Sequence, residues 1–347
     1  MTASGVGRTH GSDPEMSLHA AYTGRSSGRR SVRVLAGIAL AILLLAGAAV
    51  IVLEARWKRR FDAPYPAIGA RPEPAIVAQG EYLVYSAAAC AYCHVPREQW
   101  GRLDRGERLP LTGHHLFRLP FGDIYSANLT PDQETGIGRR SDAELARVLR
   151  FGVRADGRAA FPLMEFQLSD EDLTSIVSYL RSQRPVAHPV PEHRLTPFGK
   201  ALMAFAIAPA SPGAGARATS PAGATVERGA YLANNVSSCV SCHTNRGPDG
   251  ALTGPAFGGG QRMDVAADAT KVFVSPNLTP DPGTSPVGAW PEDTFVARFR
   301  LGEVIPGTPM PWGAFARFSD DDVRAVYRYL RSLPPTRNPT GPAVQAR

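Results

Sequence analysis

A chain of 347 residues with 31 Pro and 34 Gly is long enough for two small domains that are rich in loops and short helices. Its net charge of +7 sits at one end, because residues 1–60 hold nine Lys or Arg against three acids and leave a net of only +1 for the rest. This distribution excludes a basic nucleic-acid-binding surface and puts the excess charge beside an apolar segment.

The N-terminal part predicts a tail followed by a membrane anchor. Residues 1–33 are rich in Ser, Gly and Arg and predict a disordered tail. Residues 34–53 contain no charged or strongly polar side chain. At about 1.5 Å per residue they span about 30 Å as a helix, the thickness of a hydrocarbon core. A cleaved signal peptide is the alternative, although its apolar region is usually about 7–15 residues. Residues 54–75, with four prolines, predict a linker.

Two later segments each contain the pentapeptide pattern C-x-x-C-H, and together they use all four cysteines of the chain. This spacing is typical of covalent haem attachment, in which both thiols bond one porphyrin and the histidine binds its iron. A zinc site built from four thiolates would leave the two histidines unexplained. The sequence therefore predicts two covalently bound haem c groups. The residues concerned are Cys90, Cys93, His94, Cys239, Cys242 and His243.

The pentapeptides belong to an internal repeat of about half the chain. The stretch from Asn128 to Asp132 recurs from Asn277 to Asp281, an offset of 149 that also separates the cysteine motifs. A Gly-x-Tyr pattern ending at Tyr82 likewise recurs ten residues before the second pentapeptide, ending at Tyr231.

Capping and periodicity predict the helices within each repeat. Ser169 and Ser319 have the form of N-caps with acids in the first turn. An apolar stripe at i, i+3, i+4 and i+7 follows each of them. Ser141 opens a third helix through about Phe151 with a capping-box pattern. The predicted fold class is thus all-α, with two tandem haem-binding domains at residues 76–185 and 226–335.

The remaining segments are a connector at residues 186–225 and a tail at 336–347. Within the connector, residues 198–207 are apolar enough for a short helix that either docks on a domain or touches the membrane.

Each iron needs a second axial ligand, and the chain offers few. Met310 lies in a proline-rich loop ahead of its closing helix, and Met164 occupies the equivalent place in the first repeat. Ordinary core filling is the alternative role for each methionine. His114 and His115 are rival ligands in the first repeat, with exposed loop positions as their alternative. A thioether on both irons favours Fe(II) and leaves no open position for oxygen or peroxide, which favours an electron carrier over an enzyme.

Residues 121–132, with Thr135-Gly136-Ile137-Gly138 and Ser141-Asp142, resemble the cytochrome c subunits of bacterial membrane-bound alcohol, aldehyde and gluconate dehydrogenases. The resemblance covers most of residues 78–335. It implies two cytochrome c-like domains in which the four cysteines form thioethers, His94 and His243 are proximal ligands, and Met164 and Met310 are distal ligands. It also implies that a proline carbonyl orients the proximal histidine, a role that falls on Pro255 if Leu252-Thr253-Gly254-Pro255 matches Leu111-Thr112-Gly113-His114.

In that family the cytochrome passes electrons from a dehydrogenase to the membrane quinone pool or another acceptor. The resemblance therefore implies a bacterial inner-membrane protein with periplasmic haem domains and redox proteins as partners. Those subunits usually carry three haems and lack an N-terminal anchor, whereas this chain has two motifs and an N-terminal apolar segment. A cytochrome subunit of a terminal oxidase is the alternative carrier, and a di-haem peroxidase is the alternative from another class.

Overall fold

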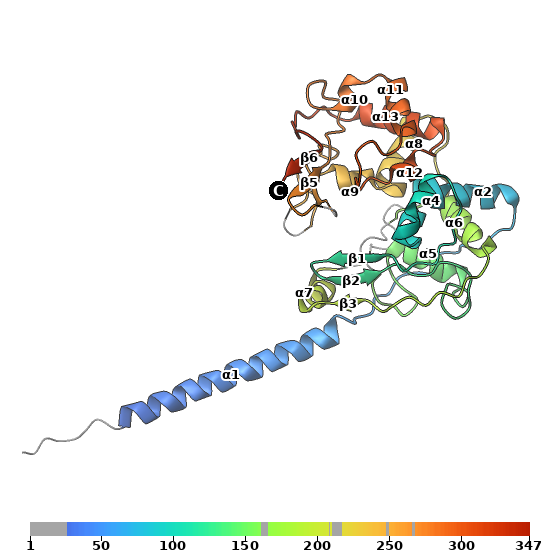
Figure 1. The fold of residues 1–347 in the computed structure, drawn as a ribbon. Coiled ribbons are helices and arrows are strands. Elements are labelled where there is room, and N and C mark those ends of the chain that lie inside the picture. Colours follow the sequence, from blue (N-terminus) through green and yellow to red (C-terminus); the bar gives the residue numbers. More distant parts are fainter. Residues whose placement is uncertain (1–25, 161–165, 208, 210–216, 248–249, 266–267) are drawn as a thin grey trace, which may run out of the picture. The chain divides into compact units, whose positions relative to one another are not determined.

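The computed structural model describes residues 26–347 except for 161–165, 208, 210–216, 248–249 and 266–267. The chain divides into two units, Met1–Glu54 and Ala55–Arg347. Most of the predicted tail, up to residue 25, lies outside the described residues, and so does Met164. The chain is mostly helical (Figure 1), but it also contains two small sheets, so the predicted all-α class is not confirmed.

The two repeats have closely similar element orders. In the first, the helices are α2 (Pro74–Tyr82), a π-helix η1 (Leu83–Ala87), α3 (Cys90–His94), η2 (Arg97–Gln99), α4 (Trp100–Asp104), α5 (Asp142–Phe151) and α6 (Asp170–Ser182). In the second they are α8 (Val226–Tyr231), a π-helix η5 (Leu232–Val236), α9 (Cys239–His243), α10 (Pro286–Ala289), α11 (Glu292–Arg300), α12 (Trp312–Phe315) and α13 (Asp320–Ser332). The connector supplies α7 (Pro197–Ala201) and a π-helix η4 (Leu202–Ala206), which confirms the short helix predicted there.

Each repeat also carries a small antiparallel sheet that the sequence did not predict. The orders are β1-β2-β3 and β4-β5-β6. The strands are β1 (Leu116–Leu119), β2 (Gly122–Tyr125), β3 (Arg194–Leu195), β4 (Arg262–Asp264), β5 (Lys271–Val274) and β6 (Val344–Ala346). Strands of two to four residues are too short to show a period of two. The third strand of each sheet comes from the predicted connector or tail, outside the predicted domain bounds.

The closing helices α6 and α13 form as predicted. The Ser169 and Ser319 side chains accept hydrogen bonds from the third helical N–H of each, and Ser141 forms a complete capping box on α5. All eight stripe residues are buried: Leu173, Ile176, Val177, Leu180, Val323, Val326, Tyr327 and Leu330. These helices therefore supply much of the core.

A glycine lets the first helix of each repeat pack closely against the closing helix. A Cβ at Gly80 would lie 1.9 Å from the carbonyl oxygen of Ser175, and one at Gly229 would lie 1.9 Å from that of Ala325. Only a residue without a side chain fits at this separation.

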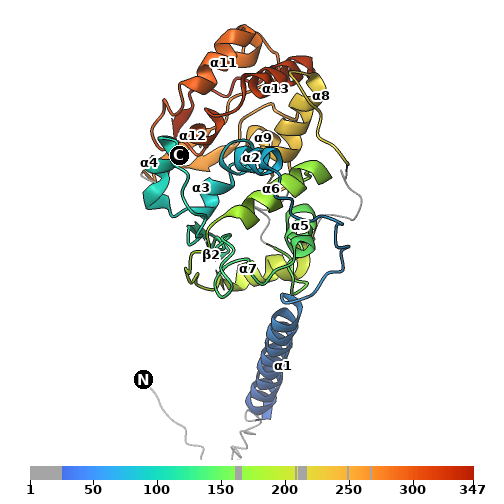
Figure 2. The same ribbon diagram turned by 90° about the vertical axis from the view of Figure 1, so that its right-hand side faces the viewer.

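The two repeats contact one another through reciprocal hydrogen bonds, and both views draw them side by side (Figures 1 and 2). The Tyr82 hydroxyl of the first repeat donates to Asp322 of the second at 2.5 Å. The Tyr231 hydroxyl of the second repeat donates to Asp172 of the first at 2.6 Å. Equivalent residues thus exchange equivalent contacts, as in a two-fold symmetric dimer interface.

The segment predicted to be a linker packs against the first repeat. The Arg147 guanidinium donates to the carbonyl of Ala63 at 3.0 Å, and the N–H of Arg71 donates to Ser178 at 2.8 Å. Ala63 and Ile68 are buried. These contacts fix the chain between the apolar segment and α2.

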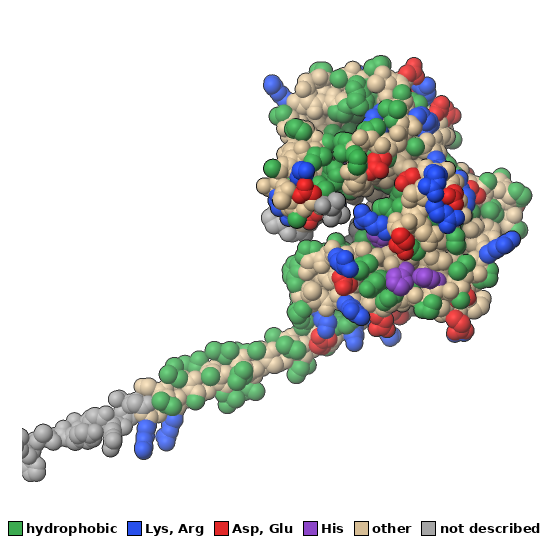
Figure 3. Space-filling view, viewed as in Figure 1, with side chains coloured by type: hydrophobic (Ala, Val, Ile, Leu, Met, Phe, Trp, Pro, Cys, Tyr) green, Lys and Arg blue, Asp and Glu red, His purple; other side chains and the backbone are tan. Residues whose placement is uncertain are grey.

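The apolar segment forms α1 (Ser26–Arg56). Its most apolar 18-residue stretch has a mean hydropathy of 2.8, and none of that stretch is buried. Hydrophobic side chains cover its surface (Figure 3). Among the described residues this is the one helix long and apolar enough to cross a membrane.

Candidate functional site

The two C-x-x-C-H pentapeptides adopt the same local structure. Each forms one short helix, α3 or α9, preceded by a π-helical turn. The residue before each first cysteine has a left-handed backbone, with φ of 50° at Ala89 and 49° at Ser238. This conformation turns the chain sharply between the π-helix and the thiols. Within each helix the two cysteines lie three residues apart, so both thiols project toward one side.

Both histidines of the pentapeptides are buried and held by a backbone carbonyl. Nδ1 of His94 lies 2.8 Å from the carbonyl oxygen of Ala127, and Nδ1 of His243 lies 3.1 Å from that of Pro276. Burial lowers the pKa of each imidazole, partly offset by this hydrogen bond, so both rings are neutral at pH 7. With Nδ1–H donating, Nε2 keeps the lone pair that a metal ion would bind.

A repeated asparagine anchors the backbone directly after each of these carbonyls. Asn128 follows Ala127, and Asn277 follows Pro276. The asparagine Oδ1 accepts from the threonine two residues later, and Nδ2 donates to the threonine seven residues later and to a carbonyl beyond the closing helix. The Asn128 distances are 2.9 and 2.8 Å to Thr130, 3.1 Å to Thr135 and 2.9 Å to Val186; those of Asn277 are 2.9 and 2.8 Å to Thr279, 3.0 Å to Thr284 and 2.7 Å to Thr336. The repeated Asn-Leu-Thr-Pro-Asp motif is thus the signal for these acceptors.

The expectation that Pro255 orients His243 is wrong. The structure gives that role to Pro276, and Ala127 fills it in the first repeat. The expected pairing of His114 with Pro255 is also wrong. The N–H of His114 donates to the carbonyl of Ser126 at 2.9 Å, and the bond at the same place in the second repeat comes from Gly260.

A glycine precedes both His114 and Gly260, and it shows how the two repeats align. Gly113 and Gly259 each donate their N–H to the carbonyl of the pentapeptide histidine at 2.8 Å. Their φ values are +74° and +73°, and a Cβ on either would lie 2.5 Å from the Ala127 or Pro276 backbone. The turn after each pentapeptide requires this glycine, and the first repeat reaches it after a loop three residues longer.

Several relatives of known role match most of the chain. An alcohol dehydrogenase (quinone) cytochrome c subunit of Gluconacetobacter polyoxogenes is 31% identical over 292 residues, covering 76% of this chain and 57% of the relative. A fructose dehydrogenase cytochrome subunit of Gluconobacter japonicus is 30% identical, covering 84% and 58%. The chain is a relative of these cytochrome c subunits. It spans a little over half their length.

A diheme cytochrome c-type protein of Cereibacter sphaeroides is 25% identical over 316 residues, covering 85% of this chain and 96% of the relative. No protein-family model matches the chain. The resemblance to dehydrogenase cytochrome c subunits is confirmed, and its relatives' names imply covalently bound haem.

The donor set of each pentapeptide fits such a haem. All four cysteines are free. Burial, followed by the neighbouring thiol, raises the pKa of Cys90 and Cys239 to about 12, so both groups are neutral thiols when no metal is bound. No group of three or more His, Cys, Asp or Glu side chains that could hold a metal ion occurs among the described residues. The four-thiolate zinc alternative has no support in this arrangement.

The sequence left two roles open for His115: iron ligand or exposed loop residue. The second is wrong. His115 is buried, its ring stacks on Trp100 with centroids 5.1 Å apart, and Phe117 packs edge-on at 4.4 Å. Its N–H bonds to Ser126, the neighbour of the residue that orients His94. The two histidines thus share one corner of the fold, which does not favour His115 as the ligand opposite His94. His114 is exposed, as its alternative role required.

Met310 is half-buried against the core, and its carbonyl accepts from the N–H of Trp312 at 2.8 Å in the first turn of α12. The loop before it therefore runs into a short helix that the sequence did not predict. Met164 lies outside the described residues.

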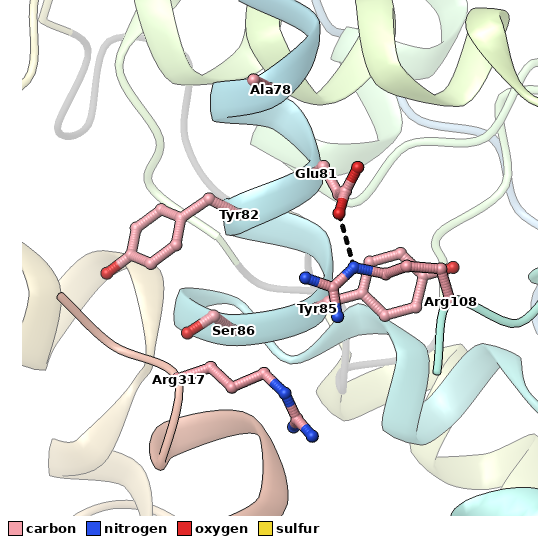
Figure 4. A pocket seen from close by; sticks show the side chains of 7 residues that line it. All are labelled: Ala78, Glu81, Tyr82, Tyr85, Ser86, Arg108 and Arg317. Carbon is pink, nitrogen blue, oxygen red and sulfur yellow. Dashed lines mark hydrogen bonds and ion pairs between the residues drawn. The ribbon is translucent and has the colours of Figure 1, made fainter. Parts of the chain in front are cut away.

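A separate cavity of about 210 Å³ lies between the repeats, lined by Ala78, Glu81, Tyr82, Tyr85, Ser86, Arg108 and Arg317 (Figure 4). Arg108 pairs with Glu81 across it at 2.5 Å. None of the pentapeptide residues lines this cavity. It belongs to the contact between the repeats.

Proposed function

We propose that the chain is a di-haem cytochrome c, anchored in a bacterial inner membrane by α1, that relays electrons from a periplasmic or membrane dehydrogenase to the respiratory chain. Haem bound at the pentapeptides would supply a one-electron Fe(III)/Fe(II) couple. The observation that carries the proposal is the pair of buried histidines, each oriented through Nδ1 by a backbone carbonyl at the same place in its repeat.

Each repeat would form one cytochrome c-like domain, at residues 76–185 and 226–335. In the first, Cys90 and Cys93 bond the porphyrin, and His94 and Met164 bind its iron. In the second, Cys239 and Cys242 bond the porphyrin, and His243 and Met310 bind its iron. A thioether ligand, together with burial of the haem, would give a higher reduction potential than a second histidine. If these histidines and methionines hold each iron, no position for a peroxide substrate would remain, which favours a carrier over a peroxidase.

The relatives support the choice of partner. Their names describe cytochrome subunits of alcohol, fructose and gluconate dehydrogenases, and we extend this partnership to the present chain. An uncleaved α1 would place both haem domains on the periplasmic side, where bacterial c-type cytochromes acquire haem. Membrane lipid would then contact the chain along α1, whose most apolar 18-residue stretch has no buried residue.

Haem counting tests the proposal directly. The full chain, expressed with a haem-attachment system and purified from membranes in detergent, should yield two haems per polypeptide by pyridine haemochrome assay and intact mass. Replacing both cysteines of one pentapeptide by serine should leave one. A count of one or none in the unaltered chain contradicts the proposal.

Optical spectra separate the carrier from the peroxidase. The ferric protein should show a Met–iron charge-transfer band, and Met310→Ala should remove its share of that band. Ready binding of peroxide to the unaltered ferric protein would favour the peroxidase instead. A dehydrogenase or oxidase gene next to that of the cytochrome distinguishes the two carrier roles.

A further inference from the structure

The connector helices leave two aromatic side chains exposed. Phe198, in α7, and Phe205, in η4, are 58% and 61% exposed. The residues between them hold the segment in place. Gly199 is buried so close to the first repeat that a Cβ there would lie 2.0 Å from the carbonyl oxygen of Phe121, and Ala204 is fully buried.

The same segment is tied to the end of the apolar helix. Arg56 Nε donates to the carbonyl of Ala204 at 3.2 Å, and the Arg59 guanidinium donates to that of Ile207 at 2.6 Å. Arg56 is the last residue of α1. These two bonds keep η4 within a side-chain length of Arg56 and Arg59, whatever direction the rest of α1 takes.

Charge and aromatic content around this point match a bilayer surface. Four of the five residues from Arg56 to Arg60 are basic, with Glu54 and Asp62 as the flanking acids. The Arg56 guanidinium lies 5.2 Å from the centre of the Phe205 ring. Lys58 and Lys200 place their ammonium groups 5.0 and 5.5 Å from the Trp57 ring. Trp beside Lys and Arg is the composition of membrane interfaces.

We propose that α7 and η4, with the basic run from Arg56 to Arg60, form a lipid-contacting surface that lies against anionic headgroups, with Phe198 and Phe205 inserted among them. A bilayer is favoured over a protein partner because the surface continues directly from the end of the span and its charge is opposite to that of anionic lipid. The surface fixes the first repeat at one height and orientation above the membrane.

This inference rests on the proposed anchoring by α1. Its test uses the full chain in nanodiscs of phosphatidylcholine and phosphatidylglycerol, with and without a lipid that carries gadolinium on its headgroup. A trifluoromethylphenylalanine replaces Phe205 in one sample and Leu301 in the control. Leu301 is similarly exposed, at 68%, and follows α11, which both ribbon views draw at the other end of Ala55–Arg347 from α7 (Figures 1 and 2).

Fluorine relaxation then reports proximity to the headgroups. An inserted aromatic side chain lies within about 5–10 Å of the headgroup boundary, so we expect a gadolinium-induced relaxation rate at position 205 at least about tenfold that at 301. Equal rates at the two positions in protein that has entered the discs overturn this surface but leave the anchor intact. Protein that fails to enter the discs overturns both.

The lipid charge is tested separately. In discs of phosphatidylcholine alone, the induced rate at position 205 should fall by about threefold or more, because the basic run loses its counter-charge. An unchanged rate overturns the role of anionic lipid.

Discussion

The contact between the repeats allows a comparison between two equivalent carboxylates in one chain. Asp322 accepts two hydrogen bonds from the buried Arg228, at 2.7 and 3.0 Å, in addition to that of Tyr82. The side chains of this ion pair are only 7% and 8% exposed. In the first repeat, Gln79 stands at the position of Arg228 and carries no charge. Two substitutions with the same chemistry, Asp322→Asn and Asp172→Asn, should therefore act in opposite directions.

Asp322→Asn leaves a buried guanidinium without its counter-ion. Removing one partner of a buried ion pair costs about 3–5 kcal/mol in unfolding free energy. With a urea m-value of about 3 kcal/mol/M, suited to a large domain, the unfolding midpoint should fall by about 1–1.7 M. The asparagine oxygen still accepts from Tyr82, so the loss reports the ion pair and not the tyrosine contact.

Asp172→Asn should be neutral or stabilising. Burial raises the pKa of Asp172, although the Tyr231 hydroxyl and the Arg228 charge oppose the shift. The pKa of Asp172 is higher in the folded than in the unfolded chain. Below the unfolded pKa this carboxyl therefore costs no free energy of unfolding, and as the pH rises through the folded pKa its ionisation lowers the stability of the folded chain. The asparagine variant escapes that loss. As the pH rises from about 4 to 7.5, the urea unfolding midpoint of this variant should therefore increase relative to that of the unaltered chain.

The assay is equilibrium urea unfolding of the haem-loaded full chain in detergent, followed by circular dichroism at several pH values. The unaltered chain and both variants are compared at equal detergent and salt. Equal losses from the two substitutions, or a loss from Asp172→Asn that grows with pH, would refute the reasoning.

Three further predictions concern the packing and the site. Gly229→Ala should lower the melting temperature strongly, since overpacking costs about 1–3 kcal/mol or more, whereas Gly283→Ala, whose Cβ would meet only a side-chain oxygen at 3.6 Å, should not. Asn277→Ala should cost about 1–3 kcal/mol and shift the reduction potential of one haem in an optical titration, because the carbonyl that orients His243 loses its support. Met310→Ala should lower one of the two potentials and leave the haem count at two, measured by titration and haemochrome assay. An unchanged melting temperature would contradict the prediction for Gly229→Ala. Unchanged reduction potentials would contradict the predictions for Asn277→Ala and Met310→Ala.

Local patterns were the reliable part of the sequence. The caps at Ser141, Ser169 and Ser319 form as predicted because capping depends on residues within one helical turn. The apolar stripes are buried for the same reason, since a period of 3.6 is visible in ten residues. The π-helical turns and the left-handed residues before Cys90 and Cys239 carry no such pattern, and Ala and Ser are not residues that indicate a positive φ.

The sequence predicted the two pentapeptide histidines as candidate ligands, but it did not predict which groups orient them. C-x-x-C-H specifies its histidine by spacing alone, whereas the carbonyl that orients it comes from 33 residues away. The prediction of Pro255 as this acceptor was wrong because the loops after the two pentapeptides differ by three residues, so that Gly113 corresponds to Gly259 and not to Gly254. The acceptors lie directly before the repeated Asn-Leu-Thr-Pro-Asp motif, whose offset of 149 was visible. The motif was found, but its structural role could not be read from its residues.

The tyrosine contacts show a limit that an internal repeat imposes on any sequence. Both closing helices have a carboxylate in their first turn that could accept a hydrogen bond from either tyrosine, Tyr82 or Tyr231. The spacing of the sequence does not say whether each tyrosine bonds to the carboxylate of its own repeat or to that of the other repeat. The structure chooses the crossed arrangement at both ends. The crossing also brings the pentapeptides together, because Ser237, two residues before Cys239, donates to the carbonyl of Ala87, three residues before Cys90, at 2.7 Å. The contact that joins the repeats therefore fixes the separation of the two thiol helices, and a carrier that relays charge from one to the other needs that separation to be constant.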